Sequence, residues 1–324
     1  MIEFGIASFV CWVVGFLANV NFHQFNQYNL ALGKDTFYFK NIENDSDAFV
    51  MLNSKNVQFW LRDIRLSPDS FLVVNNKSRE ILAVAPKQVI QKIEQGDNLK
   101  VYAGLYKYLT NSDTLGSLKF VRGRNLFFQY DYIGPKISKA SKIFEQYGVD
   151  PIIAKLLLII ESPNNNKGKS ISGAVGHFQL MPSVAKQYGL KINIHTDERE
   201  DFMKSSIAAA KLVKGYCVPW AKKIAQKKGL NTDFTENPLW FNLLVLHIYN
   251  AGAGTVSRAV DQISDVSNGR YLIQQLWTTQ YRAFGNSSQN YSQVCLASYL
   301  AYKDFLKDKI WQKNVDVRAI SSDH

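Results

Sequence analysis

The 324-residue sequence is poor in the residues that build disulfide frameworks and metal sites. It has three cysteines, Cys11, Cys217 and Cys295, and none of them forms a spaced pair. Cys11 lies in an apolar run, so the rest of the chain can form at most one disulfide, and the redox compartment stays open. His177 and His247 have no second ligand at metal spacing. The sequence therefore predicts no metal site.

Acidic residues are also scarce, with 27 Asp and Glu against 38 Lys and Arg, so the net charge is +11. Such a surplus suits an anionic partner such as nucleic acid, a membrane surface or an acidic cell-wall polymer, or it serves solubility alone. A nucleic-acid surface needs a basic stripe with interleaved aromatics. The basic residues are scattered instead, so we expect no nucleic-acid partner.

Residues 4–20, "FGIASFVCWVVGFLANV", form the longest apolar run. The preceding "MIE" has no Lys or Arg, no small residue stands before Cys11, and no clear cleavage site follows. We interpret residues 1–20 as a signal peptide or an uncleaved membrane anchor, with a buried core helix as the alternative. Export to the periplasm or cell envelope follows, with association to the inner or outer membrane left open.

The region 21–135 mixes strand-like and helix-like patterns, and its sequence does not indicate a function. "SFLVVNN" and "REILAVA" read as two short strands around a polar turn, which predicts a hairpin. "PKQVIQKIEQG" predicts a helix opened by proline and closed by glycine, and "LKFVRGRNLFFQYDYI" alternates like a strand. We expect a small mixed α/β accessory region here.

From residue 136 onward the pattern is helical. "PKISKASKIFEQYG" has apolar residues at helical spacing, and Asp150 followed by Pro151 marks a strong helix start. The helix that follows, "PIIAKLLLIIE", is apolar on nearly every face and should be buried. The sequence thus predicts an α+β protein with a mostly α-helical domain over 136–310 and a C-terminal tail over 311–324.

Glu161 ends this buried helix, directly before Ser162 and Pro163. Burial penalises its carboxylate, and the negative end of the helix dipole repels it. Both effects favour the protonated acid near neutral pH, which general-acid catalysis requires. The alternative to a catalytic role is a glutamate whose side chain simply reaches solvent from the end of the helix.

Three blocks of sequence carry a resemblance. Glu161-Ser162, "GAVGHFQLMPSVA" over 173–185 and "YNAG" over 249–252 resemble the soluble-lytic-transglycosylase-type domain. This resemblance covers roughly residues 135 to 305 and implies a fold like goose-type lysozyme. "DERED" over 197–201 and the late "SQNYSQVCLASYLAY" look closest to the membrane-bound type D branch, although its C-terminal LysM repeats are not found.

The resemblance implies peptidoglycan strands as substrate and Glu161 as the single catalytic acid and base, with no cofactor. It also implies six substrate-binding residues: Ser162, Gln179, Met181, Tyr249, Asn250 and Tyr291. The serine would orient the glutamate or the substrate, and the glutamine would line the sugar groove, with the methionine and Pro182 shaping its wall. Tyr249 and Asn250 would form hydrogen bonds near the reacting sugar, and Tyr291 would face the catalytic glutamate. A purely structural role is the alternative for Gln179 and both tyrosines.

No Asp or Glu stands between Glu161 and Gly176. A hydrolase with paired carboxylates needs a second one about 5 to 9 Å from the acid. This favours a substrate-assisted, non-hydrolytic cleavage that closes a 1,6-anhydro ring on muramic acid. A hydrolytic muramidase and a catalytically inactive wall-binding scaffold are the alternatives.

Departures from the family pattern bear on these alternatives. His177-Phe178 stands where the family has Leu-Met, and Ile248 stands in place of Ala; we expect these changes to reshape the groove. The altered loop Pro163–Lys169 could change substrate choice or rate. The acidic cluster of "DERED" suits the positive end of the helix that follows, and we interpret it as structural.

Overall fold

The computed structural model describes residues 46–76, 78–95, 104–105, 107–110, 118–163, 168–235, 237–285 and 287–321. The predicted signal peptide or anchor over 1–20 lies outside these residues. Across the ranges just given, no helix combines the length and the apolar character needed to cross a membrane.

The chain divides into two compact units. Of the described residues, the first unit takes those between 59 and 127, and the second takes those between 46 and 58 and from 128 to 321. The larger segment of the second unit thus begins at residue 128, close to the boundary expected near residue 135, and the unit also takes in an earlier segment from the region predicted as accessory.

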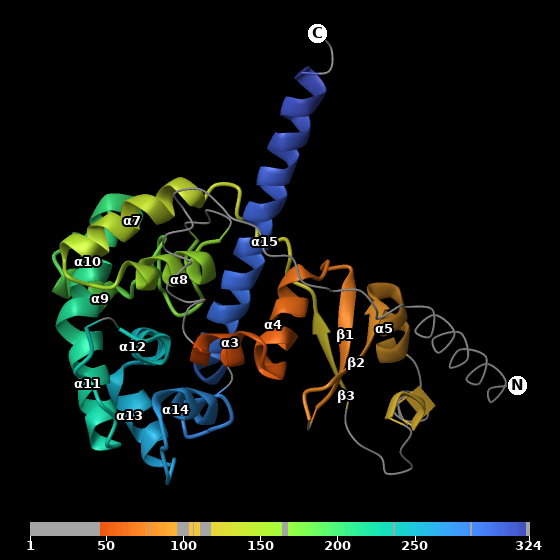
Figure 1. Cartoon of the computed structure of the whole chain (residues 1–324), viewed down its shortest axis with the longest axis horizontal. Helices are drawn as coiled ribbons and strands as arrows, with labels where there is room; N and C mark the ends of the chain where they lie inside the picture. Colours follow the sequence, from red (N-terminus) through yellow and green to blue (C-terminus); the bar gives the residue numbers. More distant parts are fainter. Residues whose placement is uncertain are drawn as a thin grey trace, which may run out of the picture. The chain divides into compact units, whose positions relative to one another are not determined.

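The first unit is built on a three-stranded antiparallel sheet in the order β2-β1-β3 (Figure 1). Its strands are β1 (Ser70–Asn75), β2 (Ile81–Pro86) and β3 (Leu118–Arg122). The β1–β2 pairing confirms the predicted hairpin. The strand expected over 118–133 stops at Arg122, because its partner β1 begins at Ser70 and offers no residue beyond that to pair with. The backbone N–H groups of Arg124 and Asn125 donate instead to the carbonyl oxygens of Asp63 and Leu66.

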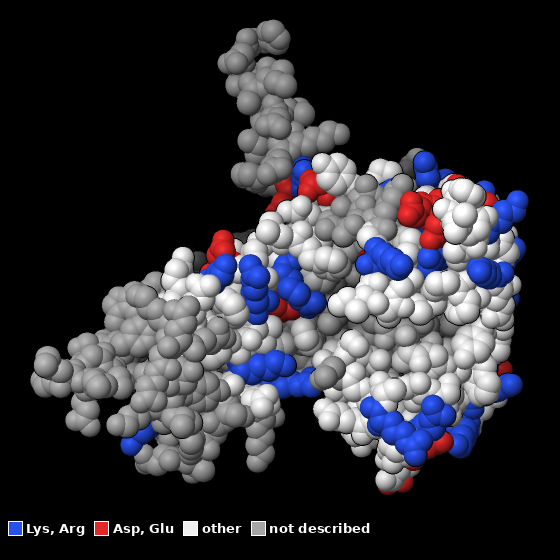
Figure 2. Space-filling model, turned by 180° about the vertical axis from the view of Figure 1, so that it is seen from behind, with Lys and Arg blue, Asp and Glu red and all other residues white. Residues whose placement is uncertain are grey.

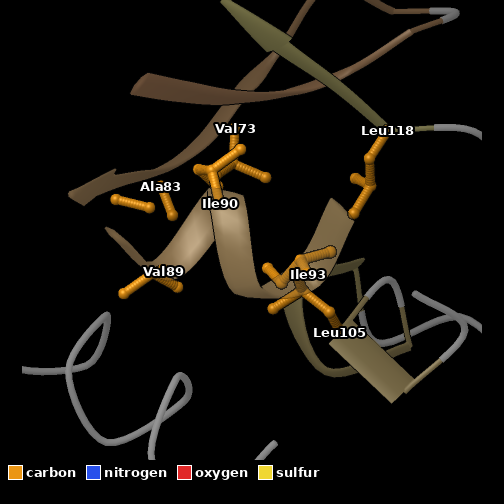
Figure 3. Packing of buried hydrophobic residues seen from close by; sticks show 8 residues of the cluster. Val73, Ala83, Val89, Ile90, Ile93, Leu105 and Leu118 are labelled. Atoms are coloured by element: carbon orange, nitrogen blue, oxygen red, sulfur yellow. The ribbon is translucent and has the colours of Figure 1, made fainter. Parts of the chain in front are cut away.

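Alternation along β1 gives this sheet two apolar faces. Val73 points toward helix α5 (Lys87–Gln95), where it packs with Val89, Ile90 and Ile93 (Figure 3). Leu72 and Val74 lie on the opposite face and pack with Phe59 of helix α4 (Lys55–Arg65). The helix predicted from "PKQVIQKIEQG" is confirmed as α5.

The second unit is mainly helical in its described residues, so the predicted α+β class is confirmed (Figure 1). Its helices are α3 (Ser46–Leu52), α7 (Gly134–Gln146), α8 (Pro151–Glu161), α9 (Pro182–Gln187), α10 (Phe202–Leu212), the π-helix η1 (Val213–Cys217), α11 (Val218–Lys227), α12 (Leu239–Ala251), α13 (Ala253–Asp261), α14 (Gly269–Leu276) and α15 (Ser287–Ser321). The last of these continues through residue 311, where a tail was expected to begin.

Helix α8 packs against α7 and α15 and carries the candidate acid at its end. The Asp150 carboxylate accepts the backbone N–H of Ile152 at 3.0 Å, and Pro151 occupies the first turn. Residues 152–159 are all buried. Among them Lys155 lies under the rings of Tyr299 and Tyr302, with its Nζ 5.9 and 5.7 Å from their centroids. The predicted cap and buried helix are confirmed.

Lys and Arg lie in several separate groups on the described surface, with Asp and Glu among them (Figure 2). The scatter seen in the sequence therefore persists on this face of the folded chain.

Candidate active site

Glu161 is half-buried at the end of α8, and its carboxyl group receives a hydrogen bond from α15. The hydroxyl of Tyr291 donates to Oε1 of Glu161 at 2.5 Å. Burial raises the pKa of Glu161 to about 7, and the hydrogen bond from Tyr291 acts in the opposite direction. A substantial fraction of Glu161 therefore keeps its proton near neutral pH.

Three further groups lie close enough to Glu161 for its charge to raise their own pKa values. Burial is the larger cause for each of them, and Glu161 adds to it at Tyr249 of α12 and at Tyr291 and Cys295 of α15. All three stay neutral at pH 7, so the two phenols keep their protons for donation. Cys295 was not singled out from the sequence, although its spacing of four from Tyr291 places both on one helix face.

Hydroxyl groups from the outer blocks hold the backbone of the middle block. Ser162 Oγ donates to the carbonyl oxygen of His177 at 3.1 Å, and the hydroxyl of Tyr249 donates to that of Phe178 at 2.7 Å. Ser162 has no exposed surface. Its bond to the carbonyl oxygen of His177 anchors the end of α8, and the role of Ser162 in orienting the glutamate or the substrate stays a prediction.

His177 and Phe178, which stand where the family has Leu-Met, are both buried. Phe178 stacks on Phe144 at 5.9 Å between ring centroids, and His177 meets Phe202 edge-on at 5.2 Å. Their side chains pack in the core and their backbone carbonyl oxygens accept bonds from Ser162 and Tyr249, so an effect of this pair on the groove stays a prediction.

Gln179 turns the chain in the middle block. Its φ is +45°, and its Nε2 donates to the carbonyl oxygens of Gly168 and Gly176 at 3.1 and 2.9 Å. The antiparallel bridge between Val175 and Leu180 closes the same loop. The amide nitrogen of Gln179 thus secures the loop, and its contact with a sugar remains a prediction.

Met181 and Asn250 are the most accessible of the predicted substrate-binding residues. The side chain of Met181 is 39% exposed, and Asn250 is exposed at the end of α12. Residues 164–167 of the altered loop beside Glu161 lie outside the described residues.

The acidic cluster was expected to be structural, and through Arg199 it holds the loop of the middle block, residues 173–180. The buried guanidinium makes two bonds to the Asp197 carboxylate, at 2.9 and 2.6 Å. Its Nη1 donates to the carbonyl oxygens of Gly173 and Leu180 at 2.9 and 3.0 Å. Asp201 caps α10 by accepting the N–H of Lys204 at 2.9 Å. Because the arginine lowers the pKa of Asp197, the pair stays charged at neutral pH.

The two histidines make contacts within the protein. His177 Nε2 lies 2.7 Å from Lys136 Nζ, and His247 bonds to Ser288 and Ser292. In the part of the chain that the structure describes, no group of three or more His, Cys, Asp or Glu could hold a metal ion.

Comparison with known proteins agrees with this architecture. Residues 138–270 match the family described as the Transglycosylase SLT domain, which supports an SLT-type domain in this part of the chain. Similar proteins include the membrane-bound lytic murein transglycosylase D of Escherichia coli strain K12 and that of Escherichia coli O6:H1 strain CFT073. Each is 31% identical over 110 residues, which are 34% of this chain and 20% of the relative. The match thus spans about a fifth of these relatives' length.

Proposed function

We propose that the chain is a lytic transglycosylase that cleaves the glycan strands of peptidoglycan. The SLT-type match and the two similar enzymes support the class of reaction. The observation that carries the proposal is the state of Glu161: its pKa of about 7 lets one carboxyl group act first as an acid and then as a base.

In the proposed reaction Glu161 protonates the glycosidic oxygen between N-acetylmuramic acid and N-acetylglucosamine. Because Oε1 accepts from Tyr291, the proton of the acid form resides on Oε2, which is the atom that delivers it. The 2-acetamido carbonyl of the sugar attacks the anomeric carbon as the glycosidic bond breaks. The Glu161 carboxylate then takes the proton of the muramic acid 6-hydroxyl, whose oxygen closes the 1,6-anhydro ring and displaces the acetamido group.

This scheme needs no second carboxylate and no cofactor. Tyr249, Tyr291 and Cys295 interact with the charge of Glu161, and none of them is a carboxylate. A muramidase that uses paired carboxylates needs a second one about 5 to 9 Å away, either as the nucleophile or as the base that activates a water. Among the described residues, the titratable groups that interact with Glu161 thus include no second carboxylate, which favours the anhydro product over a hydrolytic one.

We propose that the glycan runs along the loop that holds Gln179 and Met181 and along the end of α12. Met181 and Asn250 reach the surface there, and the Tyr249 and Gln179 side chains fix the backbone beneath them. An envelope location follows from this substrate and accords with the membrane-bound relatives, and anchoring by residues 1–20 stays a prediction.

Mass spectrometry of purified peptidoglycan digested by the wild type and by Glu161→Gln tests this proposal. We expect 1,6-anhydro muropeptides from the wild type and none from the variant. Glu145→Gln, which removes an exposed carboxylate of α7, is the matched control and should match the wild type. Reducing-end products would make the chain a muramidase. No product from the wild type, with binding to the wall retained, would show a scaffold.

A further inference from the structure

A chain of buried hydrogen bonds joins α12, α15 and the end of α14 behind the candidate acid. Trp277 Nε1 lies 2.8 Å from Ser292 Oγ, which lies 2.8 Å from His247 Nε2. His247 Nδ1 lies 3.0 Å from the carbonyl oxygen of Ser288. The side chains of His247 and Ser292 have no exposed surface, and Trp277 is 2% exposed.

The chemistry of the groups fixes the direction of each bond. The indole N–H can only donate, so Ser292 Oγ accepts it and gives its own proton to His247 Nε2. The carbonyl oxygen of Ser288 can only accept, so His247 Nδ1 carries the ring proton. A single neutral imidazole, protonated on Nδ1, is therefore compatible with all three hydrogen bonds. Burial lowers the pKa of His247 to about 4, which keeps the ring neutral at pH 7.

This series of hydrogen bonds lies next in sequence to both tyrosines that neighbour Glu161. Ser292 directly follows Tyr291 on α15, and His247 precedes Tyr249 by two residues on α12. The bonds thus fix the spacing of α15 from α12 within one residue of the hydroxyl donor to Glu161. A buried polar network whose members are all satisfied holds such a spacing more rigidly than apolar contacts do.

We infer that Ser292 and His247 are positioning residues that hold the Tyr291 hydroxyl on Oε1 of Glu161 and so govern how far it stabilises the carboxylate. The inference rests on the proposed role of Glu161 as acid and base. It concerns residues that touch no substrate and that act through Tyr291.

The inference has a specific electrostatic consequence. A hydrogen bond to the carboxylate favours the charged form, so loosening it raises the pKa of Glu161. Among the described residues, the titratable groups that interact with the charge of Glu161 are Tyr249 from α12 and Tyr291 and Cys295 from α15, and all are neutral near pH 7. His247 faces Ser288, Ser292 and the ring of Phe284, which carry no charge. A shift would therefore report the hydrogen bond itself.

The test is a direct titration of Glu161 by NMR in the full chain, with glutamate labelled with ¹³C at the side-chain carboxyl. The resonance is assigned by its loss in Glu161→Gln. We expect Ser292→Ala to raise the pKa of Glu161 by about half a unit or more, in the same direction as Tyr291→Phe and by less. The matched control is Ser298→Ala, which truncates another fully buried serine of α15 outside the chain of hydrogen bonds and should leave the titration unchanged.

A purely structural role for Ser292 would lower the melting temperature and leave the titration of Glu161 where it is, and that result would overturn the inference. The wild type gives a second check that needs no variant: ¹⁵N shifts of His247 at pH 7 must show a proton on Nδ1. A proton on Nε2 would contradict the direction assigned to these hydrogen bonds and would also overturn the inference.

The activity profile separates this inference from the proposed function. If the wild type cleaves peptidoglycan, the alkaline limb of its pH–rate profile should move upward in Ser292→Ala, because the acid form persists to higher pH. If the wild type releases no product while Ser292→Ala still shifts the titration of Glu161, the proposed function fails and the positioning role stands. If the wild type cleaves peptidoglycan and Ser292→Ala leaves the titration unmoved, the positioning role fails and the proposed function stands.

Discussion

Tyr291 and Glu161 stand 130 residues apart in the sequence, and the hydroxyl of the first donates to Oε1 of the second at 2.5 Å. Two opposing effects meet at this contact. Burial of the carboxyl group raises the pKa of Glu161, the hydrogen bond lowers it, and the balance lies at about 7. The acidity of Glu161 thus depends on the distance between α8 and α15.

Tyr291→Phe should raise the pKa of Glu161 by about 1 to 2 units, because a hydrogen bond to a charged group contributes about 1.5 to 3 kcal/mol. The alkaline limb of the rate profile should move upward with it, while the phenyl ring keeps most of the packing. Peptidoglycan digestion measured from pH 4 to 9 checks this shift. Tyr271→Phe, on the exposed face of α14, is the control and should leave the profile in place.

Glu161→Gln should stabilise the chain, and more so at higher pH. The folded pKa of about 7 lies above the ordinary value of 4.5, so the folded state holds the proton more tightly than the unfolded state. Stability that Glu161 confers below pH 4.5 is therefore lost as the pH rises through 7, and glutamine suffers no such loss. Denaturant unfolding should show a gain that grows from near zero at pH 4 to as much as about 3 kcal/mol at pH 8. A gain independent of pH would contradict a raised pKa.

Two glycines of the middle loop should respond differently to alanine. Both have positive φ, +89° at Gly173 and +82° at Gly176. An added Cβ at Gly173 meets nothing within 4 Å, whereas at Gly176 it would overlap the carbonyl oxygen of Arg199. We expect Gly173→Ala to cost about 1 to 2 kcal/mol of unfolding free energy from backbone strain, and Gly176→Ala about 3 kcal/mol or more. Equal costs measured in urea would show that the loop yields at Arg199.

Arg199→Lys should destabilise the chain by about 2 to 4 kcal/mol, because an ammonium cannot reproduce the two bonds to Asp197 or reach both carbonyl oxygens. Chemical denaturation with circular dichroism measures the change. Lys204→Gln removes the neighbouring surface ion pair with Glu198 and should have little effect, because solvent screens it. Comparable losses from both variants would mean that the clamp is not what holds the loop.

The local elements of the fold could be predicted from the sequence because neighbouring residues specify them. Asp150 and Pro151 start α8 through a cap and a fixed φ, and the apolar run after them requires burial. The polar turn between two β-rich runs likewise specified the β1–β2 hairpin. The strand expected over 118–133 forms only as far as Arg122. The bonds that Arg124 and Asn125 then make to the segment after α4 are tertiary contacts, which the alternation does not reveal.

The sequence by itself determined the chemical groups of the site: a glutamate at the end of an apolar helix, two tyrosines and a hydroxyl after the acid. Only the tertiary structure decided which partner each of these groups contacts. It turned Ser162 inward to the carbonyl oxygen of His177, brought Tyr291 onto Glu161 and buried His247 beside Ser292. Local propensities act over a few residues along the chain, whereas a pKa and a hydrogen-bond partner depend on what packs around a group from distant segments.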